Sequence, residues 1–79
     1  MLERAVEHLV RGIVDNPDDV FVTARSGRRG PTLEVQVHAD DMGRVIGRAG
    51  RTATAFRTVI HALPGGRGTR IDFVGSDEV

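Results

Sequence analysis

Apolar residues near the N-terminus recur every three or four positions, which is the spacing of one face of a helix. These residues are Leu2, Val6, Leu9, Val10 and Ile13. The pattern predicts an amphipathic helix over residues 2–14. Pro17 ends it, because the residue before a proline is driven out of the helical conformation.

The spacing then changes to the alternation of strands. Residues 20–25 are rich in β-forming side chains and predict a first strand. Residues 26–31, Ser-Gly-Arg-Arg-Gly-Pro, predict a turn. Residues 32–38 alternate apolar and polar side chains without interruption, which predicts a second strand, and residues 69–74 predict a third.

Two helices are predicted between the second and third strands. The carboxylate of Asp40 or Asp41 is expected to cap the first of them, which ends at Ile46. The second runs over residues 51–63 and is ended by the Pro-Gly-Gly that follows.

The order α-β-β-α-α-β predicts an α+β fold. The first two strands can pair as a hairpin, and the last two, joined through helices, can pair in parallel by a right-handed crossover. Three helices would then cover one face of a three-stranded mixed sheet. We expect one domain over residues 1–79, with a core over 2–74 and a flexible acidic tail over 75–79.

Composition excludes several classes of function. The chain has 79 residues and no cysteine, which excludes disulfides and thiolate chemistry. Three dispersed histidines predict no metal site, and no paired acids or nucleophile–base pattern predicts catalysis or a cofactor. Neither a membrane span nor a signal peptide is apparent, so we expect a cytoplasmic protein. The aromatic side chains are expected in the core: Phe21, Phe56 and Phe73.

Charge is unevenly distributed although the net charge is zero. Residues 43–71 contain no acid, and their charged side chains are all arginines: Arg44, Arg48, Arg51, Arg57, Arg67 and Arg70. A basic segment of this kind predicts an anionic ligand.

The sequence Gly47-Arg48-Ala49-Gly50 lies between the helix predicted to end at Ile46 and the helix predicted over residues 51–63. Its glycines allow a sharp turn and close approach of another backbone. We expect the amides of residues 47–51 to face outward, beside the positive end of the following helix, and to bind phosphate. No Gly-Lys-Ser/Thr follows, so the sequence is not a Walker loop.

Side chains around this loop supply charge and apolar surface. Arg48 is the strongest candidate for a phosphate contact, and Arg51 is the next. Arg44 is a further candidate, with an ion pair to an aspartate one helical turn earlier as its alternative. Ile46 and the edge of the strand over residues 32–38 are expected to meet the bases of a single-stranded nucleic acid.

Val-Ile-Gly-Arg-Ala-Gly, preceded by Ala-Asp-Asp-Met-Gly-Arg and followed by an amphipathic helix, resembles the KH-domain signature, whose GXXG loop clamps about four nucleotides. The additional N-terminal helix and strand are similar to the type II arrangement. Together with Asp-Asn-Pro-Asp-Asp-Val, residues 2–74 resemble the small stand-alone bacterial KH proteins of the KhpA type. One departure is Ala53, at a position that is commonly a larger aliphatic residue in KH motifs.

The resemblance implies non-enzymatic binding of single-stranded RNA, in a post-transcriptional regulator or RNA chaperone. It also implies self-association and a larger KH-containing partner. Apolar residues of the helix over 51–63 cover about half its circumference, more than a one-sided surface helix needs. Either the first helix covers the excess or a homodimer does, through Ala55, Val59 and Ala62. The alternative function is a protein-interaction or dimerisation module for which RNA binding is incidental.

Overall fold

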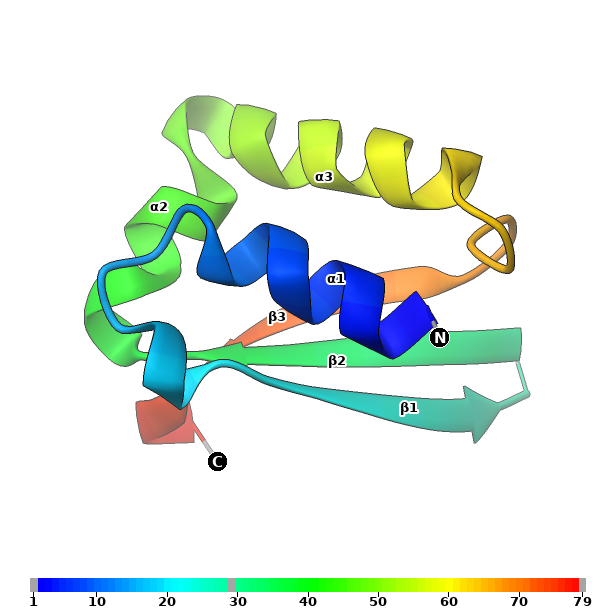
Figure 1. Ribbon diagram of the computed structural model, residues 1–79, viewed down its shortest axis with the longest axis horizontal. Helices are drawn as coiled ribbons and strands as arrows, with labels where there is room; N and C mark the ends of the chain where they lie inside the picture. The colour runs from blue at the N-terminus through cyan, green and yellow to red at the C-terminus, as the bar shows by residue number, and fades with distance from the viewer. Residues whose placement is uncertain (1, 29, 79) are drawn as a thin grey trace.

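Helices cover one face of a three-stranded sheet in the computed structural model, which describes residues 2–28 and 30–78 (Figure 1). Its helices and strands are α1 (Leu2–Arg11), β1 (Phe21–Gly27), β2 (Gly30–Val37), α2 (Met42–Ile46), α3 (Arg51–Ala62) and β3 (Arg70–Gly75). The predicted α+β architecture is confirmed. None of the described helices is both long enough and apolar enough to cross a bilayer.

The sheet has the order β1-β2-β3, with β1 antiparallel and β3 parallel to β2. The strand predicted over 32–38 is therefore the central one and is hydrogen-bonded on both sides. Our expectation that its edge meets bases is wrong, because the free edges of the sheet belong to β1 and β3.

Two predicted boundaries shift for local reasons. α1 ends at Arg11 rather than at residue 14, because Gly12 follows, and glycine is unfavourable inside a helix. The amide of Gly12 closes the last turn on the carbonyls of His8 and Leu9, both at 3.3 Å. The hairpin turn is shorter than predicted, since β1 and β2 pair as far as Gly27 and Gly30.

One layer of side chains between the helices and the sheet forms the core. Its fully buried members are Val6, Val10, Val20, Leu33, Val35, Val37, Val45, Ile60 and Ile71. The apolar alternation read from residues 32–38 corresponds to the three members from β2. Ala53 is also buried, so the small side chain at this position packs inside the fold.

The phenylalanines divide between the two faces of the sheet. Phe56 of α3 and Phe73 of β3 pack against the core with their ring centroids 6.1 Å apart. Phe21 is 55% exposed, so its predicted core position is wrong. It pairs with Gln36 in the β1–β2 ladder and shares the helix-free face with that polar side chain.

The last described residues, 75–78, are attached to the sheet. Gly75 pairs with Val37, so β3 continues one residue past the boundary predicted for the core. Ser76–Glu78 then form a 3-10 turn. The hydroxyl of Ser76 accepts a hydrogen bond from the amide of Ala39 at 3.2 Å, which holds this turn against the segment that leads into α2.

Candidate nucleic-acid interface

The loop between α2 and α3 has a backbone conformation that requires glycine at its first position. Gly47 has φ 75° and ψ 173°, a region open essentially to glycine alone. A Cβ on Gly47 would also overlap Oγ1 of Thr52. Gly50 is left-handed, with φ 74°, but a Cβ there would meet nothing within 4 Å. Position 47 is thus constrained by space and conformation, and position 50 by conformation alone.

Ala49, between these glycines, is the one described non-glycine residue with a positive φ, at 56°. This left-handed conformation costs an L-residue about 1–2 kcal/mol. Strain of this kind persists where the surrounding structure imposes it, and it concentrates at functional sites. The side chain of Ala49 is exposed, so the left-handed conformation sets the direction of the loop backbone and does not place a side chain in the core.

Three of the five amides expected to face a phosphate donate inside the molecule. The bonds run from Gly47 N to Gly43 O (2.9 Å), from Gly50 N to Gly47 O (3.1 Å) and from Arg51 N to Arg48 O. The expectation for these three is wrong, because the amide of Gly47 closes the last turn of α2, and the amides of Gly50 and Arg51 form the bonds of the 3-10 turn over Arg48–Gly50. The amides of Arg48 and Ala49 precede the first bond of that turn and remain available to a ligand.

The arginines of the basic segment differ in what they contact. Arg48 and Arg51 are exposed, and neither forms an ion pair with any described residue. Arg44 does form one, through Nη2 and Oδ2 of Asp15 at 2.9 Å, and not with an aspartate one turn earlier. The uncompensated positive charge of the loop therefore comes from Arg48 and Arg51.

Ile46 is half-buried at the end of α2 and packs against the core. α2 lies against both α3 and β3, and the loop that follows Ile46 leads into α3 in the helix layer (Figure 1).

Asp41 holds the start of α2 in place by a contact that the sequence pattern did not indicate. Its carboxylate, 1% exposed, accepts hydrogen bonds from Asp15 N (3.1 Å), Asn16 N (3.0 Å) and Asn16 Nδ2 (3.1 Å). Neither Asp41 nor Asp40 caps the amides of α2 with its side chain, so that prediction is wrong. The carboxylate instead joins the α1–β1 connection to the helix that carries the loop.

The environment of Asp41 shifts its acidity. Burial by itself raises the pKa of this carboxyl, but hydrogen bonds from Asp15 and Asn16 outweigh burial and hold the pKa below its ordinary value of 3.8. Because the folded-state pKa is depressed, the stabilisation is complete above the unfolded-state value and is lost as the pH falls through the folded-state value.

We expect Asp41→Asn to lower the urea midpoint of unfolding at pH 7, because the new amide presents a donor to three donors. The difference from the wild type should shrink as the pH is lowered below 3.8, where the wild-type carboxyl becomes protonated. Asp40→Asn is the matched control, since the Asp40 side chain is exposed, and its midpoint should follow the wild type. Equal midpoints for the two variants at pH 7 would contradict this role of Asp41.

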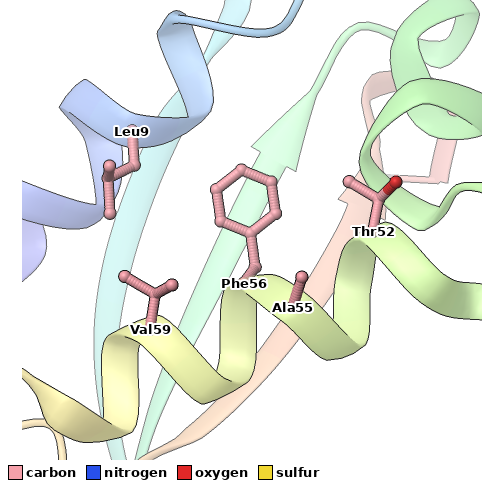
Figure 2. Close-up of a pocket in the computed structure, with 5 residues that line it drawn as sticks. All are labelled: Leu9, Thr52, Ala55, Phe56 and Val59. Atoms are coloured by element: carbon pink, nitrogen blue, oxygen red, sulfur yellow. The ribbon is translucent and has the colours of Figure 1, made fainter.

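An apolar hollow of about 170 Å³ lies on the α1-facing side of α3 (Figure 2). Leu9 points into it from α1, and the α3 side chains that line it are Thr52, Ala55, Phe56 and Val59. Val59 is 48% exposed, so α1 covers only part of the apolar arc of α3. Of the predicted dimer residues, Ala55 and Val59 line the hollow, while Ala62 is exposed farther along α3.

The described residues contain no group of three potential metal-ligating side chains that could hold an ion. The chemistry that the loop offers is therefore that of free amides, two uncompensated guanidinium groups and an adjacent apolar residue. Such a set suits a phosphate with an apolar group beside it.

Comparison with known proteins adds the family. A family model described as "KhpA/KhpB, KH domain" matches residues 3–73. The RNA-binding protein KhpA of Streptomyces coelicolor is 66% identical over 79 residues, covering 100% of this chain and 99% of the relative. The protein of the same description from Mycobacterium tuberculosis is 65% identical over 74 residues, 94% of this chain and 91% of the relative. No solved structure matches.

Proposed function

The chain belongs to the KhpA/KhpB family of KH domains, and we propose that it binds single-stranded RNA through Gly47-Arg48-Ala49-Gly50. Its relatives are described as RNA-binding proteins, and the family is not one of enzymes. The observation that carries the proposal is the loop itself: two available amides lie beside two exposed arginines that form no ion pair with any residue the structure describes. Only a polyanion uses all four groups.

Within this site the roles divide by chemistry. The amides of Arg48 and Ala49 bind phosphate oxygens, and the guanidinium groups of Arg48 and Arg51 add charge around them. Ile46 contacts a base or ribose beside the loop. Arg44 contributes less than the other two arginines, because its ion pair with Asp15 must be exchanged for the phosphate.

The salt dependence of binding tests the phosphate contacts. If two to four phosphates are neutralised, log K should fall against log salt with a slope of about −1.4 to −2.8 for a single strand. Arg51→Ala should reduce the magnitude of that slope by about 0.7. The measurement is fluorescence anisotropy of a labelled oligoribonucleotide at five salt concentrations. A flat response would show that no phosphate is neutralised.

We further propose that the protein is a homodimer through the exposed apolar surface of α3. Ala55, Val59 and Ala62 carry no charge, and within α3 the only charged side chains are Arg51 at its start and Arg57, which is turned to β3. Two copies related by a two-fold axis can therefore approach without like-charge repulsion. Two RNA sites in one particle would raise the apparent affinity by avidity.

Val59→Asp should convert a dimer into a monomer, because the hollow would then bury an unpaired charge. Thr58→Asp is the matched control, since it adds the same charge at a neighbouring exposed position of α3. Light scattering gives the mass of each variant. A mass unchanged by Val59→Asp, or changed equally by both substitutions, would exclude this interface.

The apolar hollow also favours a second candidate function, a protein-interaction or dimerisation module whose RNA binding is incidental. Light scattering with and without a short RNA separates the two. The RNA-binding proposal requires the RNA to join the particle and to be lost on loop substitution, whereas the second candidate requires an assembly indifferent to both.

The cellular role follows from these properties. A single site of about four nucleotides has little sequence information, which suits an RNA chaperone or post-transcriptional regulator in the cytoplasm. A larger KH-containing protein is the proposed partner where one copy alone binds weakly. Crosslinking in cells followed by sequencing of the bound RNA tests this role directly.

A further inference from the structure

A second turn built from glycine and arginine lies at the other end of α3 from the glycine loop (Figure 1). It consists of Gly66-Arg67-Gly68-Thr69, the α3–β3 turn. The amide of Thr69 donates to the carbonyl oxygen of Gly66 at 3.1 Å. The glycine loop is closed by a bond of the same kind and length, from its fourth residue to its first.

The two turns share the features on which the proposed phosphate contacts depend. The second residue of each is an exposed arginine, and Arg67, like Arg48, forms no ion pair with any described residue. The third residue of each has a positive φ, 79° for Gly68 and 56° for Ala49. In both turns the amides of the second and third residues donate to no residue that the structure describes. The α3–β3 turn therefore offers two adjacent amides and one uncompensated guanidinium group, which suit a phosphate.

Contacts inside the fold hold the α3–β3 turn in place. A Cβ on Gly66 would overlap the carbonyl oxygen of Ile60, so the backbone of the turn packs directly on the last turn of α3. Thr69 is 3% exposed, and its hydroxyl donates to the carbonyl oxygen of Gly65 at 3.2 Å. Nε2 of His61 donates to the carbonyl oxygen of Thr69 at 2.9 Å. The backbone of the turn is thereby fixed before any ligand binds, which lowers the cost of ordering it on binding.

The charge around the α3–β3 turn also favours an anion. The acid-free part of the sequence continues past the turn to Ile71. The first acid that follows, Asp72, is already paired, through Oδ1 and Nε of Arg70 at 3.2 Å. A phosphate at the turn therefore meets no unpaired carboxylate from the adjoining residues of the chain.

The length of α3 separates the two turns. The helix has 12 residues, so its axis is about 18 Å long. A KH loop of this kind holds about four nucleotides. A strand bound at the glycine loop therefore needs additional nucleotides to reach the α3–β3 turn.

We propose that the α3–β3 turn is a second phosphate-binding site, which holds the backbone of an RNA strand beyond the nucleotides bound at the glycine loop. The inference rests on the proposed RNA binding. The guanidinium of Arg67 and the amides of Arg67 and Gly68 donate to the phosphate oxygens. Every nucleotide carries the same phosphate, so this site raises the affinity for longer strands without sequence selectivity.

Two substitutions test the site, each with a control. Arg67→Ala removes the charge of an exposed side chain, and its control is Arg4→Ala, because Arg4 is an exposed arginine of α1 that forms no ion pair with a described residue. Gly68→Asp places a negative charge beside the two amides, and a Cβ at this position meets nothing within 4 Å. Its control is Gly68→Asn, because asparagine and aspartate both enter the left-handed region more readily than most residues.

The experiment measures the affinity of the full chain for labelled tetrauridylate and dodecauridylate by fluorescence anisotropy. Arg67→Ala should lower the affinity for the dodecauridylate by roughly three- to tenfold. It should also reduce the magnitude of the salt slope for that RNA by about 0.7. Gly68→Asp should lower the same affinity at least as far, whereas Gly68→Asn and Arg4→Ala should retain it. All four variants should bind the tetrauridylate as the wild type does.

Wild-type affinity for the dodecauridylate in either Arg67→Ala or Gly68→Asp would overturn the proposal, and any advantage of the longer RNA would then come from the avidity of a dimer. Equal losses in Arg67→Ala and Arg4→Ala would also overturn it, because they would reflect general charge attraction. Equal losses for both RNA lengths would do the same, and urea midpoints would show whether unfolding caused them. Tetrauridylate binding that survives two aspartates in the glycine loop would refute the proposed function itself, whatever the variants of the α3–β3 turn show.

Discussion

Replacing Arg48 and Ala49 together with aspartate is expected to abolish RNA binding while leaving the fold intact. The double substitution exchanges one positive charge for two negative charges beside the two available loop amides. Juxtaposed like charges cost several kcal/mol, so the affinity should fall by more than about a hundredfold. Filter binding or anisotropy with a short single-stranded RNA measures the loss.

The fold should tolerate these changes because both side chains are exposed. Position 49 has a left-handed backbone with φ 56°, and aspartate enters that region more readily than most residues. The urea midpoint and circular dichroism of the variant should therefore match those of the wild type.

Arg48→Asn with Ala49→Asn is the matched control, since asparagine has the shape of aspartate without its charge. This variant should lose only the Arg48 contact and retain measurable binding. An unchanged binding curve for the aspartate variant would remove the loop from the site.

Gly47→Ala is expected to be the most damaging single substitution in the loop. The residue would have to hold φ 75° and ψ 173°, at a cost of about 1–3 kcal/mol, and its Cβ would overlap Oγ1 of Thr52. The start of α3 must then shift, which displaces the loop amides from the phosphate. Both the urea midpoint and the RNA affinity should fall.

Two other glycines provide graded controls for this prediction. Gly50→Ala also requires a left-handed residue but meets no atom within 4 Å, so it should cost about 1–2 kcal/mol. Gly43→Ala lies inside α2 with open space around it and should stabilise the protein by up to about 1 kcal/mol. Equal urea midpoints for Gly47→Ala and Gly50→Ala would show that overlap of the new Cβ with Thr52 adds no destabilisation.

The predictions that hold depend on patterns between near neighbours in the chain. The alternation over residues 32–38 identifies both the strand and its buried face, and the glycine spacing identifies the loop between α2 and α3. Helix and strand periods arise from local backbone geometry, so a short window of sequence contains them. The family follows from the same local signature.

The predictions that fail concern partners distant in sequence. Asp41 has the residue type and the position of a helix cap. Its carboxylate instead accepts hydrogen bonds from the backbone amides of Asp15 and Asn16, which lie 26 and 25 residues earlier in the chain. The amides of Gly47, Gly50 and Arg51 look available from their spacing, yet the last turn of α2 uses the first and a 3-10 turn uses the other two. Nothing in the local pattern distinguishes these alternatives.

The sequence by itself determined the elements, the mixed α+β class and the position of a basic glycine loop. Only the tertiary structure decided that Phe21 faces away from the helices, and that Arg57 is directed to Ile71 while Arg48 is not. The reason is physical. The periodicity of a helix or strand is set by backbone geometry between near neighbours in the chain. The hydrogen-bond partner of a side chain is set by which distant segments pack against it in the folded protein.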